Sequence, residues 1–371
     1  MSDRIPMVDL APQHEALLPD LRRAFERVLA SNRFILGDEV AAFERELAQA
    51  LDVPFAVGLS SGSDALLVAL AACGVGPGDD VVTTPFSFFA TVEAIVRLGA
   101  RPVFADIDPA TLNIDPRAAA ALVGPRTKAA LIVHLFGRVA ETRVLEQACA
   151  ARNIPLVEDA AQAIGAVAAD GRAPGRIGAA ATLSFFPSKN LGGFGDGGML
   201  LTASPEIAEH ARRARVHGAT RRFVHETLGG NFRLDELQAA LLRCKLPHLG
   251  AWRERRREIA ARYHESWAGL PLGLPPPDPG SAWNQFVIRV PNGRRDALAA
   301  HLGSTGIETS ILYPSPFHLQ PALAHLGGRR GTLPNAEQAA DEVLAVPIFP
   351  ELSPERQARI SEATIQFFRR R

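Results

Sequence analysis

One lysine in this chain, Lys189, lies in a setting that a charged surface side chain does not need. It belongs to the segment Ser-Phe-Phe-Pro-Ser-Lys-Asn at residues 184–190, and the glycine-rich run Gly-Gly-Phe-Gly-Asp-Gly-Gly follows at residues 192–198. A lysine that forms a Schiff base must lie beside a flat cofactor, and glycine lets the flanking backbone approach that cofactor without steric cost. If Lys189 carries pyridoxal phosphate (PLP), the chain should also supply a phosphate site, an acid for the pyridine nitrogen and a stacking aromatic.

The segment Ser-Ser-Gly-Ser-Asp at residues 60–64 is the candidate phosphate site. It lies between an expected strand and an expected helix, where backbone amides and the helix N-terminus favour a dianionic group. The hydroxyls of Ser61 and Ser63 would add donors. The alternative is an ordinary helix cap, because Ser and Asp favour that position. Ser184, five residues before Lys189, is a further candidate for the phosphate.

The segment Glu-Asp-Ala-Ala-Gln at residues 158–162 places two carboxylates at the end of an expected strand. Asp159 is the candidate partner of the pyridine nitrogen. A buried carboxylate keeps that nitrogen protonated, which makes the ring an electron sink. Gln162, one helical turn later, is placed to donate to the phenolic oxygen of the ring. The alternative is that the acidic residues only open a helix.

Phe88 is the candidate that stacks on the ring. It is one of three aromatic residues in residues 85–89, which follow the end of another expected strand. The alternative is that these aromatics belong to the core. His134, at a further strand end, either faces the cofactor or is structural. Together, four strand ends supply a phosphate site, an acid, an aromatic and a lysine, in the region where α/β sheets bind ligands.

The elements that would position these residues alternate along the chain from about residue 54 to residue 215. Short, nearly all-apolar segments separated by helical ones indicate a buried, largely parallel sheet that is covered on both faces. The expected strands are residues 54–59, 80–84, 101–105, 129–134 and 154–158.

The C-terminal part is expected to form a second, smaller domain. Residues 230–245 have the spacing of a long amphipathic helix, and the proline-rich residues 271–280 resemble a linker. The elements expected beyond this linker are a strand at 285–290, a helix at 294–302 and an edge strand at 306–312. We predict an α/β fold with a large domain over residues 1–248 and a smaller α+β domain over residues 249–371.

Composition excludes several other functions. Forty basic residues balance forty acidic ones, so no overall charge attracts nucleic acid or an anionic membrane. No apolar run reaches the roughly 18 residues of a membrane-spanning helix, and the N-terminus lacks a signal core, which predicts a cytoplasmic protein. Cys73, Cys149 and Cys244 lack paired spacing and are expected to be reduced. We predict no metal site.

Seven motifs of this chain resemble those of the DegT/DnrJ/EryC1/StrS family of sugar aminotransferases, in the order of that family. The resemblance extends from about residue 34 to residue 350 and implies the aspartate-aminotransferase-like fold of PLP enzymes, called fold type I. The motifs are residues 61–66, 76–81, 134–137, 158–162, 184–192, 217–218 and 230–240.

The resemblance implies a role for each candidate residue. Lys189 would bind the cofactor covalently, Asp159 would pair with the pyridine nitrogen, and Phe88 would stack on the ring. The family forms homodimers with active sites at the subunit interface, so Asn231 is expected to reach the cofactor phosphate of the neighbouring subunit. The remaining expected cofactor contacts are Gln162 at the phenolic oxygen and Gly62, Ser63 and Ser184 at the phosphate.

The chain departs from the family pattern where substrate is expected. Leu312 stands where a histidine is common, beside Tyr313, and Phe223 stands where a tyrosine is frequent. Ser63 replaces the usual threonine and keeps the hydroxyl. We expect His225 and Tyr313 to contact substrate. The altered position 312 puts the usual substrate pose in doubt.

The resemblance implies a PLP-dependent aminotransferase. Related dehydratases carry histidine in place of the lysine, so the presence of Lys189 favours transamination. The expected reaction moves an amino group from glutamate to a nucleotide-linked 3-keto or 4-keto sugar, for amino-sugar, polysaccharide or natural-product biosynthesis. The alternatives are an aminotransferase for a keto-cyclitol or other ketone, and a cofactor-bearing regulatory protein without turnover. The nucleotide, the sugar and the aminated position stay open.

Overall fold

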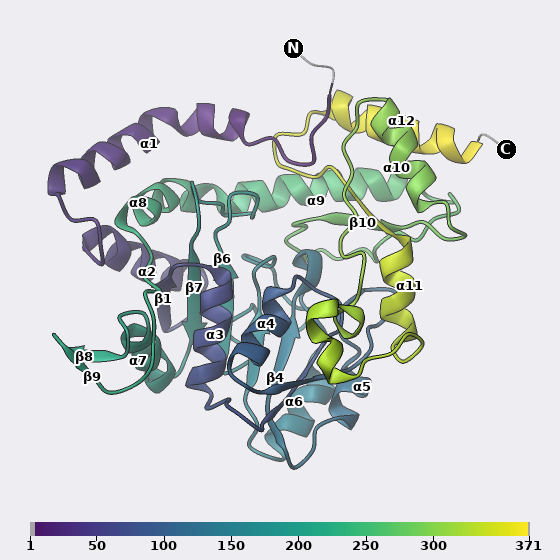
Figure 1. The fold of residues 1–371 in the computed structure, drawn as a ribbon. Coiled ribbons are helices and arrows are strands. Elements are labelled where there is room, and N and C mark those ends of the chain that lie inside the picture. The colour runs from purple at the N-terminus through teal and green to yellow at the C-terminus, as the bar shows by residue number, and fades with distance from the viewer. Residues whose placement is uncertain (1–3, 370–371) are drawn as a thin grey trace.

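A sheet of seven strands forms the centre of the computed structural model, which describes residues 4–369 (Figure 1). The strand order is β1-β7-β6-β5-β4-β2-β3, and β7 runs in the direction opposite to that of the other six strands. This arrangement confirms the predicted, mostly parallel sheet. The strands are β1 (Phe55–Leu59), β2 (Asp80–Thr83), β3 (Arg101–Phe104), β4 (Thr127–Val133), β5 (Leu156–Asp159), β6 (Ala180–Ser184) and β7 (Gly198–Thr202).

Helices cover both faces of this sheet because its strands are apolar on both faces. In β4, Leu131 packs toward one helical layer, whereas its neighbour Ile132 packs toward the other. Successive strand residues point to opposite faces, so a strand buried on both sides needs an almost unbroken apolar run. One layer contains α3 (Gly62–Ala72), α4 (Ala90–Arg97) and α7 (Pro205–Ala214). The other contains α2 (Asp38–Ala50), α5 (Pro116–Ala121), α6 (Arg143–Ala150) and α8 (Glu236–Lys245).

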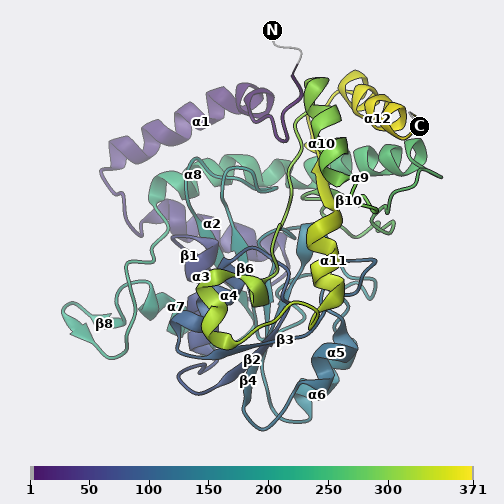
Figure 2. The ribbon, with the colours of Figure 1, turned by 45° about the vertical axis from the view of Figure 1, so that its right-hand side comes forward.

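A separate core lies around Tyr263, Trp267 and Phe286. In both views α9 continues from α8 toward this core (Figures 1 and 2). We propose that this core belongs to a smaller α+β domain, and that its boundary lies at residue 248, at the short 3-10 turn between α8 and α9. The N-terminal segment joins this core, since Ile5 pairs with Ile307. The elements are α9 (Leu249–Ser266), β10 (Phe286–Arg289), α10 (Arg295–Ser304), α11 (Pro334–Glu342), β11 (Val343–Val346) and α12 (Pro354–Arg369).

Two expected elements differ from the structure. The helix predicted from residue 230 begins only at Glu236, because residues 231 and 233 form bridges to Val216 and Leu59 instead. The strand predicted at 306–312 is absent among the described residues, where this segment makes only single bridges, at Ile307 and Ser310. The remaining elements are α1 (Ala11–Ser31), β8 (Ala219–Arg221) and β9 (Val224–His225).

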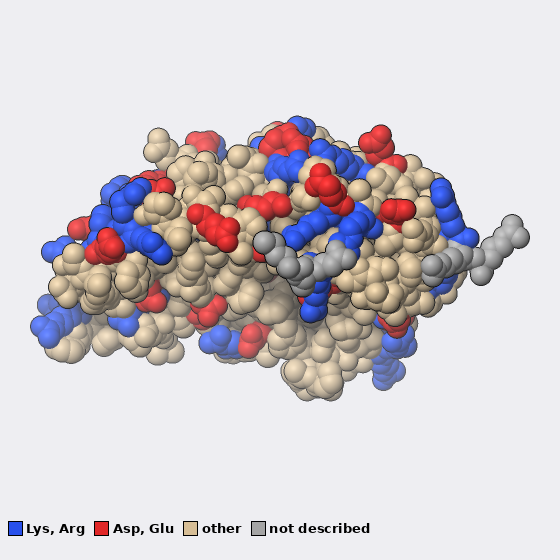
Figure 3. All heavy atoms as spheres, turned by 90° about the horizontal axis from the view of Figure 1, so that it is seen from above, with Lys and Arg blue, Asp and Glu red and all other residues tan. Residues whose placement is uncertain are grey.

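Charged residues of both signs are interspersed on the face that Figure 3 shows. This distribution agrees with the balanced composition and offers no patch of one sign there. Within residues 4–369, no helix combines the length and the apolar character needed to cross a membrane.

Glu236 fixes the start of α2 from the neighbouring helix. Its carboxylate is 2% exposed and accepts hydrogen bonds from the amides of Gly37 (2.7 Å), Glu39 (3.0 Å) and Val40 (2.9 Å). The first amides of a helix have no partner within the helix, and Gly37 has no side chain to cap them. An acid on α8 therefore caps α2.

Glu236→Ala is expected to lower the free energy of unfolding by about 3 kcal/mol or more, because several charge-assisted hydrogen bonds are lost together. Urea denaturation of the variant measures this loss. The control is Glu209→Ala on the surface of α7, for which we expect a change within about 0.5 kcal/mol. Equal stability of Glu236→Ala and the unchanged protein would contradict the capping role.

Candidate active site

The predicted site residues at the strand ends meet along one edge of the sheet. The order β6-β5-β4-β2 brings the carboxyl ends of these four strands side by side. Ser184 ends β6, Asp159 ends β5 and is paired with Val133 of β4, and Phe88 follows β2. This edge is where open α/β sheets bind ligands.

Asp159 is buried and held by two hydrogen bonds. It is 5% exposed, and its Oδ2 atom accepts a bond of 2.8 Å from the Thr91 hydroxyl. Its Oδ1 atom accepts a bond of 3.2 Å from the amide of Ala161. The Ser87 hydroxyl lies 3.1 Å from that of Thr91 and extends the network. Burial raises the pKa of Asp159, while these hydrogen bonds and the charge of Lys189 favour its ionised form.

Lys189 lies half-buried in a turn after β6, within electrostatic reach of Asp159. The backbone fixes this turn, since the amide of Lys189 donates to the carbonyl of Phe186 at 2.8 Å. Burial lowers the pKa of the Lys189 amine, and the Asp159 carboxylate opposes that shift. A desolvated lysine is more often neutral and therefore nucleophilic.

His134 is fully buried and both of its ring nitrogens have protein partners. Its Nδ1 atom accepts from the amide of Ala140 at 3.1 Å, so Nε2 carries the proton and donates to Glu158 at 2.8 Å. The other oxygen of Glu158 accepts from the amides of Gly175 and Gly178. These contacts give His134 a structural role, which was one of the two interpretations of the sequence.

Gln162 and Tyr313 are in direct contact, although the sequence assigned them to cofactor and substrate separately. Gln162 Oε1 accepts from the amide of Phe136 at 2.6 Å, and its Nε2 donates to the Tyr313 hydroxyl at 3.1 Å. The Tyr313 ring lies parallel to that of Phe136, with centroids 6.3 Å apart. Burial raises the pKa of the Tyr313 hydroxyl, which keeps this group protonated.

The serine-rich turn before α3 combines a helix cap with open donors. Ser61 Oγ accepts from the amide of Asp64 at 3.0 Å, so the capping interpretation is confirmed for Ser61. Within the described part of the chain, the Ser63 hydroxyl has no hydrogen-bond partner. Gly62 touches Ser184, because a Cβ atom at position 62 would lie 2.8 Å from the Ser184 Cβ. The two candidate phosphate segments therefore lie against each other.

The three aromatics that follow β2 have different environments. Phe86 is buried in the core, and Phe89 packs against Phe317 with ring centroids 6.1 Å apart. Phe88 is 62% exposed. Of the three, Phe88 alone presents an open ring, as stacking on a ligand requires.

Asn231 is followed by Phe232, whose carbonyl accepts from the amide of Ser60 at 2.9 Å, whereas His225 lies on the β8–β9 hairpin. Asn231 and His225 are both exposed, and the hairpin projects from the body of the chain (Figures 1 and 2). The Nδ1 atom of His225 lies 2.9 Å from the carbonyl oxygen of His217. On the same hairpin, Phe223 is 81% exposed.

The glycines after Lys189 fit tightly against the protein itself. A Cβ atom would lie 2.1 Å from the Pro187 carbonyl oxygen at Gly192, 2.8 Å from Gln238 at Gly193 and 2.2 Å from the Ser61 carbonyl at Gly198. These contacts explain the glycines without a ligand, whereas the sequence suggested an approach to the cofactor. Sequence reasoning also missed Thr91, for which a hydroxyl shortly after a strand end is the only signal.

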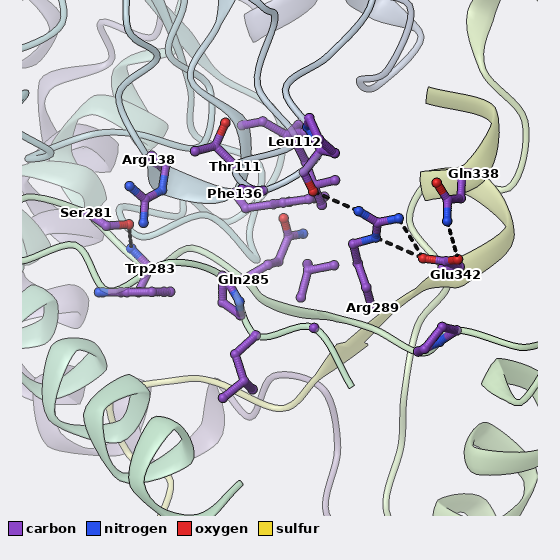
Figure 4. A pocket seen from close by; sticks show the side chains of 18 residues that line it. Thr111, Leu112, Phe136, Arg138, Ser281, Trp283, Gln285, Arg289, Gln338 and Glu342 are labelled. Atoms are coloured by element: carbon purple, nitrogen blue, oxygen red, sulfur yellow. Dashed lines mark hydrogen bonds and ion pairs between the residues drawn. The ribbon is translucent and has the colours of Figure 1, made fainter. Parts of the chain in front are cut away.

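A cavity of about 340 Å³ lies between residues 109–138 and residues 273–342 (Figure 4). Phe136, Gln285 and Trp283 line it, together with Arg289, which forms a 2.7 Å ion pair with Glu342. None of the predicted site residues lines this cavity. The candidate active site is the edge of the sheet, where the Lys189 amine lies within electrostatic reach of the buried Asp159 carboxylate.

Comparison with known proteins places the chain among aminotransferases. The model of the DegT/DnrJ/EryC1/StrS aminotransferase family matches residues 17–364. A pleiotropic regulatory protein of Geobacillus stearothermophilus is 47% identical over 98% of this chain and 99% of its own length. The dTDP-3-amino-3,4,6-trideoxy-alpha-D-glucose transaminase of Streptomyces venezuelae is 42% identical, with coverage of 99% and 97%. The UDP-N-acetyl-3-dehydro-alpha-D-glucosamine 3-aminotransferase of Acidithiobacillus ferrooxidans is 41% identical, with coverage of 96% of both chains.

Solved structures are similar over the whole chain. The crystal structure of S. venezuelae DesV in complex with a ketimine intermediate has a TM-score of 0.96 at 41% identity and covers 100% of both chains. NtdA from Bacillus subtilis with bound cofactor PMP has a TM-score of 0.93 at 28% identity, over 100% of this chain and 86% of its own. These similarities confirm the predicted fold class.

Proposed function

Because the chain belongs to the DegT/DnrJ/EryC1/StrS aminotransferase family, we propose that it transfers an amino group from glutamate to a nucleotide-linked keto sugar. Its activity as an aminotransferase follows from the family. The observation that carries the proposal for the site is the half-buried amine of Lys189 within electrostatic reach of the buried carboxylate of Asp159. A cytoplasmic location is part of this proposal.

The residues at the edge of the sheet fit PLP, the cofactor of this family. The fit rests on a lysine of lowered pKa, a buried acid and an open aromatic ring. It also rests on the serine turn at the N-terminus of α3, where the Ser63 hydroxyl has no hydrogen-bond partner among residues 4–369. When bound, PLP supplies an electron-withdrawing ring that stabilises negative charge on a neighbouring carbon. The residues proposed to hold it are Lys189 by a covalent bond, Asp159 at the ring nitrogen, Phe88 on the ring face, Gln162 at the phenolic oxygen and Gly62, Ser63 and Ser184 at the phosphate.

Two side chains would perform the proton chemistry. Asp159, held by Thr91 and the amide of Ala161, would offer a fixed negative charge to a protonated ring nitrogen. As a free amine, Lys189 Nζ would accept the proton from the Cα atom of the amino donor and, in the second half-reaction, return a proton to the sugar carbon. A lowered pKa suits this exchange, because an acid–base group works best with a pKa near the operating pH.

We also propose that two copies of the chain complete each site. The α1 helix exposes Leu18, Phe25 and Leu29, and clustered exposed apolar side chains are typical of protein interfaces. The projecting β8–β9 hairpin carries His225, and Asn231 is exposed nearby in the sequence. In a homodimer, these two residues would reach the site of the other subunit, at its substrate and its cofactor phosphate respectively.

The relatives favour a 3-keto sugar as the acceptor. The names of the S. venezuelae and A. ferrooxidans relatives both place the new nitrogen at carbon 3, on a dTDP sugar and a UDP sugar respectively. We propose that Tyr313, which is bonded to Gln162, contacts the sugar in this chain. Leu312 beside it offers no hydrogen bond, so the pose there must differ from that in family members with histidine.

A regulatory protein without turnover is the second candidate, because a 47% identical relative is named a pleiotropic regulatory protein. The combination of Lys189 with Asp159 favours an enzyme, since an amine at a ligand-binding sheet edge within electrostatic reach of a buried carboxylate is an arrangement that acid–base catalysis uses. Turnover therefore separates the two candidates.

The proposal is tested by incubating the purified protein with glutamate and a panel of ketones, followed by mass spectrometry of the products. The panel contains dTDP- and UDP-linked 3-keto sugars, the 4-keto isomers and keto-cyclitols. We expect amination of at least one nucleotide-linked sugar and none of the cyclitols. Amination of cyclitols alone would replace the substrate class. Bound cofactor without any product across the panel would support the regulatory candidate.

A further inference from the structure

Two side chains of α8 hold the backbone of the loop that carries Lys189, which we define as the lysine loop, residues 185–195. Lys245 Nζ donates to the carbonyl oxygen of Gly192 at 2.6 Å. Gln238 Oε1 accepts from the amide of Phe194 at 2.8 Å. The two side chains are seven residues apart on α8 and therefore lie on the same face of the helix, so one helix face binds both a carbonyl and an amide of the loop.

Gly192 and Lys189 belong to the same closed loop of the backbone. The chain folds back on itself here, because the amide of Gly193 donates to the carbonyl of Phe185 at 2.7 Å and closes residues 185–193 into a loop that contains Lys189. A Cβ atom at Gly192 would lie 2.1 Å from the Pro187 carbonyl oxygen. Because the loop is closed, we expect a shift of residue 192 to displace the Cα atom of Lys189 as well.

Packing alone does not explain a lysine at position 245. The side chain is 1% exposed, and burial lowers its pKa to about 8. Among the described residues 4–369, Lys245 forms no salt bridge, although the more distant charge of Glu351 partly offsets the lowered pKa of its amine. The amine lies 5.5 Å from the ring centroid of Phe194 and 5.9 Å from that of Trp252. Burying a charge without an ion-pair partner is costly, and an apolar side chain of similar volume is often equally or more stabilising.

Lysine is also a rare residue in this chain. Only three of the 40 Lys and Arg residues are lysines: Lys128, Lys189 and Lys245. Arginine presents a rigid, planar fork that suits two oxygens, whereas an ammonium group is compact and can donate to a single carbonyl. The single acceptor at Gly192 fits the ammonium group.

We propose that Lys245 is a positioning residue, which acts through the Gly192 carbonyl, together with Gln238 at the Phe194 amide, to fix where the lysine loop presents the amine of Lys189. This inference rests on the proposed function, in which Lys189 Nζ transfers protons. Misplacement of a reacting group by about 1 Å can cost about 10²-fold in rate. The loss should appear in kcat, since Lys245 does not line the region where substrate is expected.

Lys245→Met tests the proposal in the holoenzyme, with the exposed Lys128→Met as the matched control. Methionine keeps the length of the side chain and removes its donor and charge. We expect kcat to fall by about 10- to 100-fold with KM within about threefold. We expect Tm to be unchanged or higher, because a buried charge is removed. Lys128→Met should change none of these values.

Hydrogen–deuterium exchange provides a readout that does not depend on turnover. In Lys245→Met we expect faster exchange of the amides in residues 185–195 and unchanged exchange in β4 and β5. Gln238→Leu should show the same local effect more weakly, since Phe194 is partly exposed and water can replace the lost hydrogen bond. If Lys245→Met does not fold, Gln238→Leu provides the test of the proposal.

Unchanged kcat together with unchanged exchange in the lysine loop would overturn the positioning role and leave the proposed function intact. A lower Tm with unchanged kcat per folded molecule would also overturn it, in favour of a purely structural lysine. If the unaltered protein shows no turnover, the proposed function fails, and unchanged exchange in the loop of Lys245→Met would then reject the positioning role separately.

Discussion

Replacement of Lys189 by alanine is expected to reduce amino transfer by about 10⁴-fold or more, because the variant loses both the covalent attachment point and the proton-transferring amine. The fold should survive, since the side chain is only half-buried and the turn is held by backbone hydrogen bonds. Assays with glutamate and a keto sugar, quenched at fixed times, measure the rate of amino transfer. Absorption spectra measure the loss of the lysine-bound cofactor.

Lys128→Ala is the control for this prediction, since Lys128 is exposed on β4. The chain has only three lysines, so borohydride reduction followed by peptide mapping identifies the modified residue without ambiguity. We expect the cofactor on Lys189 alone. Attachment at Lys245, or transamination by Lys189→Ala at an unchanged rate, would contradict the assignment.

Asp159→Asn is expected to lower kcat by about 10²- to 10³-fold, the range found when one preorganised charge-stabilising group is removed. Asparagine keeps the shape and can still accept the hydrogen bond from Thr91. It carries no negative charge, however, so a protonated ring nitrogen would lose its counter-charge. Steady-state rates at saturating substrate measure the effect.

Glu158→Gln is the matched control, because Glu158 precedes Asp159 on β5 and points to the opposite face of the sheet. Its carboxylate binds His134 and two glycine amides. This variant should lower stability and keep turnover per folded molecule. If both variants reduce turnover equally, the ring-nitrogen role of Asp159 is wrong.

The sequence predicted the frame of the site because that frame depends on local patterns. Apolar strands such as β4 are buried on both faces, so their ends and the order of helices could be recognised without coordinates. Asp159, Phe88 and Ser184 each follow or end such a strand, and a parallel sheet brings these ends together. The predictions were wrong for residues 230–235 and 306–312, because these segments form single bridges to distant segments.

The supporting contacts could not be predicted for the same reason. Thr91 bonds to Asp159 across 68 positions of the sequence, and Lys245 bonds to Gly192 across 53. Neither pair has a spacing that a helix or strand imposes. The sequence showed residues 230–245 as an amphipathic helix, but not that Glu236, Gln238 and Lys245 each hold a distant backbone segment.

The roles of Asn231 and His225 depend on a second copy of the chain. Both residues are exposed in the single chain, and His225 lies on the projecting hairpin. A family resemblance can suggest such roles. Neither the periodicity of the sequence nor the fold of a single chain, however, shows how two subunits are arranged. Their assignment therefore stays a prediction.

The most direct test of the central claim follows the nitrogen atom. The purified protein is incubated with nitrogen-15-labelled glutamate and a nucleotide-linked 3-keto sugar, and both products are analysed by mass spectrometry. We predict that the label appears in the sugar and that 2-oxoglutarate forms in equal amount. An unlabelled sugar and no 2-oxoglutarate, from protein that contains its cofactor on Lys189, would contradict the account.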